Sequence, residues 1–224
     1  MYESRMLEQF SKVAVFSLSD INQIISNKAY AKSFLRRMLK DKKIIKVRRN
    51  TYTLYKDPFL VSAFIIKPSY ISSVSALSYH GLITQIPNEV FCMTTKRSSK
   101  IKFLNEINFF HTNYFFGFKA EEYDGFKILI AEPEKAIIDS FFIVPVSIFE
   151  EAFDGIDKER MIDLLKRIKK SSIVKRVGYL MERNGYDAYN ELKGFINYKY
   201  IPLDPLVKKN GKRNRKWRII VNIG

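Results

Sequence analysis

The chain has 224 residues, with 39 Lys and Arg against 23 Asp and Glu, which gives a net charge of +16. A hydrophobic fraction of 46% supports a folded core and excludes a disordered polycation. A single cysteine excludes a disulfide framework, and neither a signal peptide nor an apolar run of membrane-spanning length is found, so we expect a cytoplasmic protein without membrane contact.

The excess positive charge is confined to the two ends of the chain. Residues 1–56 contain thirteen Lys and Arg against four Asp and Glu, and residues 207–224 contain seven against none. The residues between these segments contain nineteen of each kind. A uniformly alkaline protein would not concentrate its charge in this way, so the pattern indicates contact with a polyanion.

Three helices and a hairpin are expected within residues 1–56. The first helix covers residues 3–10, and the second follows a capping-box pattern at Ser17 and Asp20. Residues 28–40 predict a third, basic helix, because four apolar residues recur at helical spacing: Ala31, Phe34, Leu35 and Met38.

The segment after this helix changes from helical to alternating hydrophobicity. Arg49 and Asn50 divide two short runs, and asparagine tolerates the positive φ of a tight turn, so we expect a β-hairpin. The expected inward side chains are Ile45, Val47, Tyr52 and Leu54, and the expected outward ones are Lys46, Arg48, Thr51 and Thr53. A basic helix followed by a hairpin predicts a winged helix-turn-helix, whose helix enters the major groove of DNA.

The outer faces of the basic helix and the hairpin carry the residues that we expect at the DNA. Ser33 and Arg36 are the candidates for contacts with base edges. The candidates for phosphate contacts are Tyr30, Lys32, Arg37, Lys46, Arg48 and Arg49. A merely solvated basic face is the alternative for each single residue.

Residues 57–224 are expected to form a second, α+β domain: a mixed α/β domain with a small sheet and a helical C-terminal part. Asp57-Pro58 opens a helix, and a helix over residues 72–79 would end at Gly81. Strands are expected at residues 90–94, 107–111 and 126–131, and helices from Pro133 onward and at 147–153, 158–169 and 173–184. A basic loop at 208–216 precedes a last strand at 217–222.

Residues suited to catalysis are scarce. His80, His111 and Cys92 are the only histidines and cysteine, so a four-ligand zinc site is excluded, and we expect a buried, inert Cys92 and a capping or core His80. No Walker loop, GxGxxG or GxSxG motif occurs. Glu132 and Glu134 could hold a metal ion in a nucleotidyltransferase, but the upstream Gly-Ser turn of such enzymes is missing. We therefore expect no enzyme, no metal site and no cofactor.

Several stretches resemble a known protein family. Residues 48–54 (RRNTYTL) look like its wing, and residues 75–82 (SALSYHGL), 94–97 (TTKR) and 132–139 (EPEKAIID) look like its middle domain. Residues 217–222 (WRIIVN) are similar to the ending of some members. The family is the AbiEi-type antitoxins of type IV, abortive-infection toxin–antitoxin systems. The resemblance implies a winged-helix repressor of its own operon, acting at inverted repeats in double-stranded DNA. It also implies a C-terminal part that counters a nucleotidyltransferase-like toxin from the neighbouring gene.

The sequence thus predicts a transcriptional autorepressor and antitoxin with domains at 1–56 and 57–224. The basic C-terminal segment is expected to contact DNA through Lys212, Arg213 and Arg215, with a toxin-contacting surface or a solvated tail as alternatives. An RNA-binding winged-helix protein is the first alternative for the whole chain. A metal-dependent nuclease or nucleotidyltransferase subunit that uses Glu132, Glu134 and Asp139 is the second.

Overall fold

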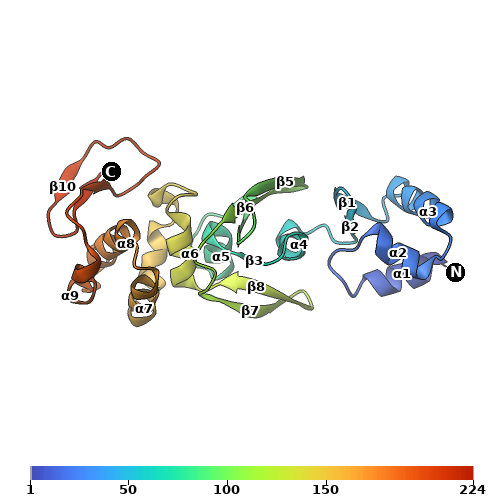
Figure 1. Cartoon of the computed structure of the whole chain (residues 1–224), viewed down its shortest axis with the longest axis horizontal. Helices are drawn as coiled ribbons and strands as arrows, with labels where there is room; N and C mark the ends of the chain where they lie inside the picture. The colour runs from blue at the N-terminus through green and yellow to red at the C-terminus, as the bar shows by residue number, and fades with distance from the viewer. Residues whose placement is uncertain (1, 224) are drawn as a thin grey trace. The chain divides into compact units, whose positions relative to one another are not determined.

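The computed structural model describes residues 2–223 and has an α+β fold, as expected (Figure 1). The helices are α1 (Tyr2–Phe10), α2 (Leu18–Ile24), α3 (Lys28–Lys40), α4 (Pro58–Ile65), α5 (Ser73–Tyr79), α6 (Pro133–Ser140), α7 (Lys158–Ile168), α8 (Ser171–Arg183) and α9 (Tyr189–Leu192). Three 3-10 helices are η1 (Val146–Ile148), η2 (Glu150–Gly155) and η3 (Lys193–Phe195), in the part of the chain that is described.

The strands belong to three sheets within residues 2–223. A hairpin pairs β1 (Ile45–Arg48) with β2 (Thr51–Thr53). A mixed sheet has the order β5-β6-β4-β3-β8-β7, with bounds Ser99–Phe103, Asn105–His111, Glu89–Thr94, Ser69–Ile71, Phe126–Ala131 and Phe118–Tyr123. A small third sheet has the order β10-β11-β9, with bounds Lys212–Asn214, Ile219–Val221 and Ile201–Pro202.

The chain divides into two compact units. The first comprises Met1–Tyr70, Asn88–His111 and Ala120–Leu129, and the second comprises Ile71–Pro87, Thr112–Lys119 and Ile130–Gly224. The domain boundary expected between residues 56 and 57 stays a prediction.

The first three helices form around one apolar cluster that the sequence pattern predicts. Ser17 and Asp20 make the expected capping box at the start of α2. The predicted apolar face of α3 is buried in full, together with Met6, Phe10, Phe16 and Ile21 from the preceding segments. Burial of this face fixes which side of α3 is left to solvent.

The hairpin differs from its expected pattern at one residue. Asn50 has φ of 57° in the turn, as expected, and Val47 and Tyr52 are buried. Thr53, expected to face outward, is fully buried, and its Oγ1 donates to the Ala14 carbonyl oxygen at 2.7 Å. A threonine at this position supplies a donor to the buried carbonyl group, which an apolar residue cannot do.

The strands expected at residues 90–94, 107–111 and 126–131 are present as β4, β6 and β8. β4 and β6 are parallel, with Cys92 opposite Phe109, and β5 pairs antiparallel to β6. The strands β3, β5 and β7 were not expected. The basic segment at 208–216 is not wholly a loop, because β10 lies within it, and the helix expected at 147–153 is replaced by the two short helices η1 and η2.

In the second unit, Trp217 packs the small sheet β10-β11-β9 against α8. Trp217 is fully buried, and its Nε1 donates to Glu182 at the end of α8. A Cβ atom on Gly178 would lie 2.1 Å from the Trp217 ring, so the indole requires a glycine on this helix. No helix within residues 2–223 has both the length and the apolar character needed to cross a bilayer.

Candidate nucleic-acid interface

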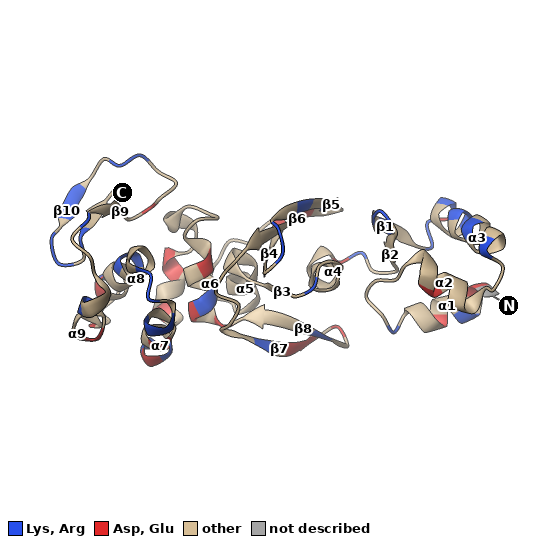
Figure 2. Ribbon diagram, in the orientation of Figure 1, with Lys and Arg blue, Asp and Glu red and all other residues tan. Residues whose placement is uncertain are grey.

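The start of α3 is set by Asn27, whose side-chain oxygen accepts hydrogen bonds from the backbone N–H groups of Ala29 and Tyr30, both at 3.0 Å. This cap satisfies two of the donors that a helix start leaves free. The apolar face of α3 is buried in the cluster, and the opposite, exposed face is basic. The first turn contains no acidic residue, and the last turn contains Arg37 and Lys40 (Figure 2).

Three of the predicted DNA-binding residues on α3 are solvent-exposed and unengaged. Lys32, Ser33 and Arg36 are exposed, and their side chains make no hydrogen bond, ion pair or ring contact with any other residue in the described part of the chain. Ser33 and Arg36 are three residues apart, so they lie on the same side of the helix. Their side chains can therefore reach a ligand without first breaking a contact within the protein.

Tyr30 and Arg37 flank this face and both pack against Phe34. The Arg37 Cζ atom lies 5.2 Å from the centroid of the Phe34 ring, and the ring of Tyr30 lies 6.3 Å from the same centroid. Tyr30 remains 43% exposed. At Glu3, a hydrogen bond from Lys43 lowers the carboxyl pKa, and the charge of Arg37 contributes to the same shift.

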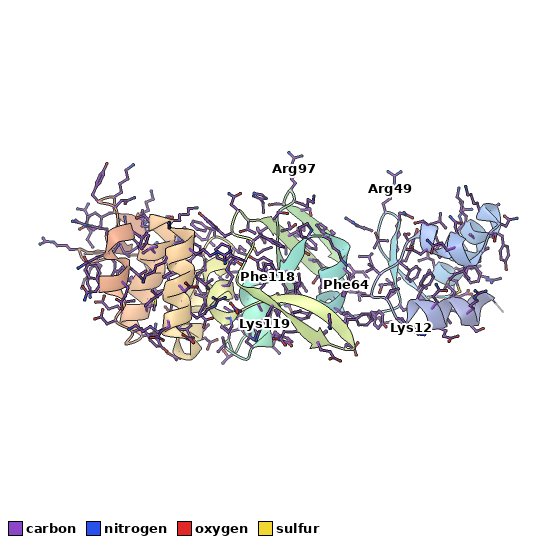
Figure 3. All side chains as sticks on the ribbon, turned by 60° about the horizontal axis from the view of Figure 1, so that its bottom comes forward. Lys12, Arg49, Phe64, Arg97, Phe118 and Lys119 are labelled. Carbon is purple, nitrogen blue, oxygen red and sulfur yellow. The ribbon has the colours of Figure 1, made fainter. Side chains whose placement is uncertain are left out.

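The hairpin presents two unengaged cations and one engaged cation. The side chains of Lys46 and Arg49 are exposed and have no partner within residues 2–223, and Arg49 extends away from the ribbon at the turn (Figure 3). Arg48 differs, because its Nη2 donates to the Ile65 carbonyl oxygen at 2.8 Å. The phosphate contact expected of Arg48 stays a prediction, and the structure uses this guanidinium to attach the hairpin to the end of α4.

Two further contacts fix the hairpin beside the helices. Phe16 and Tyr52 exchange backbone hydrogen bonds at 2.9 and 2.8 Å, and Asn50 Oδ1 accepts from the Leu18 N–H at 3.2 Å. The exposed cations of α3 and of the hairpin therefore belong to one rigidly connected group of elements. Strand β5 lies beside β1 and adds the exposed Lys102 to the cations of the hairpin. The sequence did not predict this neighbour, because a short strand with alternating lysines gives little signal of where it pairs.

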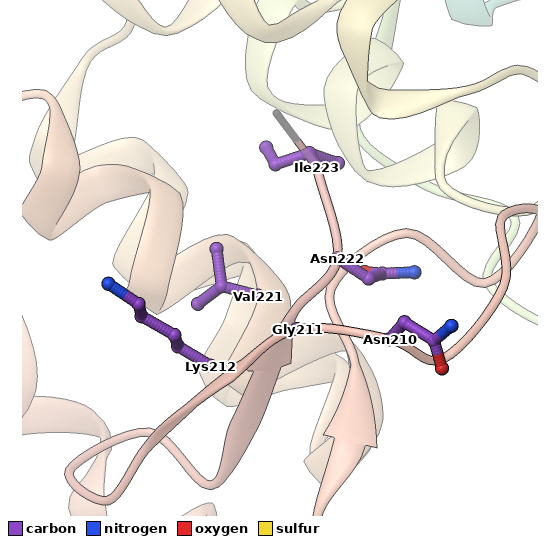
Figure 4. A pocket seen from close by; sticks show the side chains of 6 residues that line it. All are labelled: Asn210, Gly211, Lys212, Val221, Asn222 and Ile223. Carbon is purple, nitrogen blue, oxygen red and sulfur yellow. The ribbon is translucent and has the colours of Figure 1, made fainter.

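The three predicted cations near the C-terminus do not share one environment. Lys212 and Arg213 are consecutive in β10 and so project to opposite faces of the strand. Lys212 lines a shallow pocket with Asn210, Gly211, Val221, Asn222 and Ile223 (Figure 4), whereas Arg213 lies against Tyr200. Arg215 is exposed without a partner in the described chain, and these residues belong to the second unit, apart from those of α3.

Each carboxylate of the alternative metal site forms an ion pair or a hydrogen bond with another residue of the protein. Glu132 pairs with Arg160, and Glu134, 4% exposed, accepts the Asp157 N–H at 2.8 Å. Asp139 pairs with Lys135 and accepts from Ser72. No cluster of three or more His, Cys, Asp and Glu residues suited to a metal ion occurs within residues 2–223.

Cys92 and His80 have the structural roles that the sequence predicts. His80 caps α5, and its Nε2 lies 2.8 Å from the Ala131 carbonyl oxygen. Cys92 is fully buried, and burial raises the pKa of its thiol to about 12. Since the thiolate is the reactive form, a buried thiol with such a pKa is inert.

We expect Cys92 to react with a small thiol reagent at pH 8 only when the chain opens. The pKa of the Cys92 thiol is near 9 in the unfolded chain and about 12 in the folded protein, so between these pH values only the unfolded chain loses the proton. The free energy of unfolding therefore falls as the pH rises above 9. The measurement is the labelling rate in buffer and in denaturant. Labelling of native protein at the rate found in denaturant would show that Cys92 is accessible.

A scan against protein-family models finds none that matches this chain, and no curated protein matches it at a significant level.

Proposed function

We propose that this protein is a DNA-binding transcriptional repressor that contacts duplex DNA through an N-terminal winged helix-turn-helix. The observation that supports this most strongly is the exposed face of α3, where Lys32, Ser33 and Arg36 have no partner within the described residues. In a winged helix-turn-helix such a helix lies in the major groove, and the cations of the hairpin contact the backbone beside it.

The proposed roles follow from what each side chain can reach. Ser33 and Arg36 contact base edges, because they share the side of α3 opposite its buried face. Lys32, Lys46 and Arg49 contact phosphates, with Tyr30, Arg37 and Arg48 at the margins of the interface. The cations Lys212, Arg213 and Arg215 form a second, separate contribution to phosphate binding.

We further propose that the protein represses its own operon and is the antitoxin of a type IV toxin–antitoxin pair. The support is the family resemblance of residues 48–54, 75–82, 94–97, 132–139 and 217–222. The test is genetic: a neighbouring gene for a nucleotidyltransferase-like protein should arrest growth when expressed alone and should not do so together with this protein. Growth arrest that this protein does not relieve would contradict the antitoxin role.

Arg36→Ala should weaken binding to the DNA upstream of the protein's own gene more than binding to random duplex. Loss of a bidentate base contact costs about 1–3 kcal/mol of discrimination, which is roughly 5- to 150-fold. Arg49→Ala should weaken both DNAs equally, because a phosphate contact carries no sequence information. The measurement is fluorescence anisotropy at fixed salt, with random RNA as a third ligand.

Arg5→Ala is the matched control, because Arg5 is an exposed arginine on α1 in the same unit. It should change none of the three affinities by more than about twofold. If Arg36→Ala lowers the affinity for both DNAs equally, then Arg36 contacts only phosphate and α3 does not read base edges. Preference for RNA over both duplexes that Arg36→Ala reduces would contradict the proposed function as a whole, because it would mean that α3 binds RNA.

A further inference from the structure

The loop that leads into β9 carries an exposed aromatic side chain among cations. Tyr198 is 78% exposed, and no hydrogen bond or ring contact joins it to any other described residue. Its neighbours Asn197 and Lys199 are exposed as well. Most of the apolar surface of this ring is therefore in contact with solvent in the folded chain.

This loop is held in place from both sides by the protein. The ammonium group of Lys175 in α8 donates to Asn197 Oδ1 at 2.6 Å and to the Lys199 carbonyl oxygen at 2.5 Å. Lys175 is 1% exposed, and burial lowers its pKa, with the charges of Arg218 and Arg176 acting in the same direction. The Asn197 N–H donates to Ser171 Oγ at 3.0 Å. The direction of Tyr198 is therefore set by the fold rather than by a free loop.

Cations gather at the next aromatic residue along this loop. The Cζ atoms of Arg213 and Arg218 lie 5.3 Å and 5.5 Å from the centroid of the Tyr200 ring, and Arg218 Nη1 donates to Tyr200 Oη at 3.3 Å. Residues 196–203 contain no acidic residue, and the carboxylate of Asp204 is buried and accepts backbone N–H groups. The positive charge at Tyr200 is therefore not neutralised by an exposed carboxylate of this loop.

We propose that this surface, consisting of Tyr198, Lys199, Tyr200, Arg213 and Arg218, binds a single-stranded nucleic-acid segment. An unpaired base stacks on the Tyr198 ring, and the adjoining phosphates contact Lys199 and the two guanidinium groups. Aromatic rings that alternate with cations are the common means of binding single strands without sequence preference. A duplex offers no free base face, so Tyr198 has no function on double-stranded DNA.

A protein partner fits this surface less well. Tyrosine and arginine are common at protein–protein interfaces, but lysine is depleted there, and this surface contains the exposed Lys199 and no exposed carboxylate from its loop. All residues of the surface belong to the second unit, and the inference does not depend on the DNA contacts proposed for α3. Arg213 serves in both proposals, and Tyr198 separates them because only a single strand can use its ring.

The test measures binding of full-length protein to labelled 12-nucleotide RNA, to 12-nucleotide DNA of the same sequence, and to the corresponding duplex. Tyr198→Ala should weaken single-strand binding about tenfold and duplex binding less than twofold, because base stacking on the ring is possible only for the single strand. Tyr198→Phe, which keeps the ring, should bind as the unaltered protein does. Arg213→Ala should reduce the log–log salt slope for single strands by about 0.7 for each phosphate that the variant no longer neutralises.

Two controls make the outcome decisive. Tyr79→Ala removes another exposed tyrosine of the same unit and should leave single-strand binding unchanged. Arg5→Ala, which removes an exposed arginine of the first unit, should do the same. Preference for the RNA or for the DNA strand identifies the natural ligand. Absence of single-strand binding, or equal loss of affinity for single strand and duplex in Tyr198→Ala, would overturn the proposal.

Discussion

Asp139→Ala is expected to destabilise the protein by about 3–5 kcal/mol, the cost of leaving a buried charge without its partner. Lys135 and Asp139 are one turn apart on α6, and their side chains are 0% and 6% exposed. The second oxygen of Asp139 accepts from Ser72 Oγ at 2.8 Å. The substitution therefore removes an acceptor that the buried ammonium group of Lys135 and the buried hydroxyl group of Ser72 share.

The measurement is urea unfolding followed by circular dichroism. Asp163→Ala is the matched control, since Asp163 is 69% exposed and pairs with Arg160 at the surface, and we expect its effect to stay within about 1 kcal/mol. Lys135→Met combined with Asp139→Leu should recover most of the missing stability, because a hydrophobic pair of similar volume often replaces a buried ion pair without loss. A cost below about 1 kcal/mol for Asp139→Ala alone would mean that water reaches Lys135.

Trp217→Ala should cost about 3–5 kcal/mol, the usual effect of truncating a large buried aromatic side chain to alanine. The indole packs on Gly178, lies 5.3 Å from the Tyr189 ring in a T-shaped arrangement, and donates to Glu182. Glu182 also accepts from Lys216 at 2.8 Å. Loss of the indole therefore removes the packing between the small sheet and α8 as well as one hydrogen bond.

Trp217 is the only tryptophan, so its fluorescence reports on this sheet in the unaltered protein, and the variant is followed by circular dichroism. Trp217→Phe retains most of the packing and loses the N–H group, so it should cost less than Trp217→Ala. Arg215→Ala, an exposed substitution in the same segment, should be nearly neutral. Equal stability of Trp217→Ala and the unaltered protein would show that the sheet is not needed for the stability of the second unit.

The N-terminal elements could be predicted because their signals are local. The buried face of α3 follows from four apolar residues at helical spacing, and the hairpin turn follows from Asn50. Thr53 could not be placed, because its acceptor is the Ala14 carbonyl group, 39 positions away in the chain. The unexpected strands β5 and β7 are exposed sheet edges rich in Lys or Glu, where alternation of apolar residues is weak.

The sequence predicted which residues of the candidate site are exposed, but it did not predict which of them contact other elements of the fold. Exposure of Lys32, Ser33 and Arg36 follows directly from the helical periodicity. The engagement of Arg48 by Ile65 depends on a contact between elements that no spacing reveals. The buried cations Lys135, Lys175 and Arg176 were equally hidden, because a lysine or arginine in a sequence is ordinarily assigned to the surface.

The close packing of the C-terminal sheet has a consequence for finding relatives of this chain. A Cβ atom on Gly211 would lie 1.8 Å from the Val221 carbonyl oxygen, and the Asn222 side chain bonds to Asp204, Val207 and Lys208. An exposed basic residue such as Arg215 can change position in this segment during divergence, because charge acts at a distance. Gly178, Gly211, Trp217 and Asn222 cannot be exchanged independently, since each is fitted to a fixed neighbour. Their joint retention would mark common descent even where overall identity has decayed beyond detection.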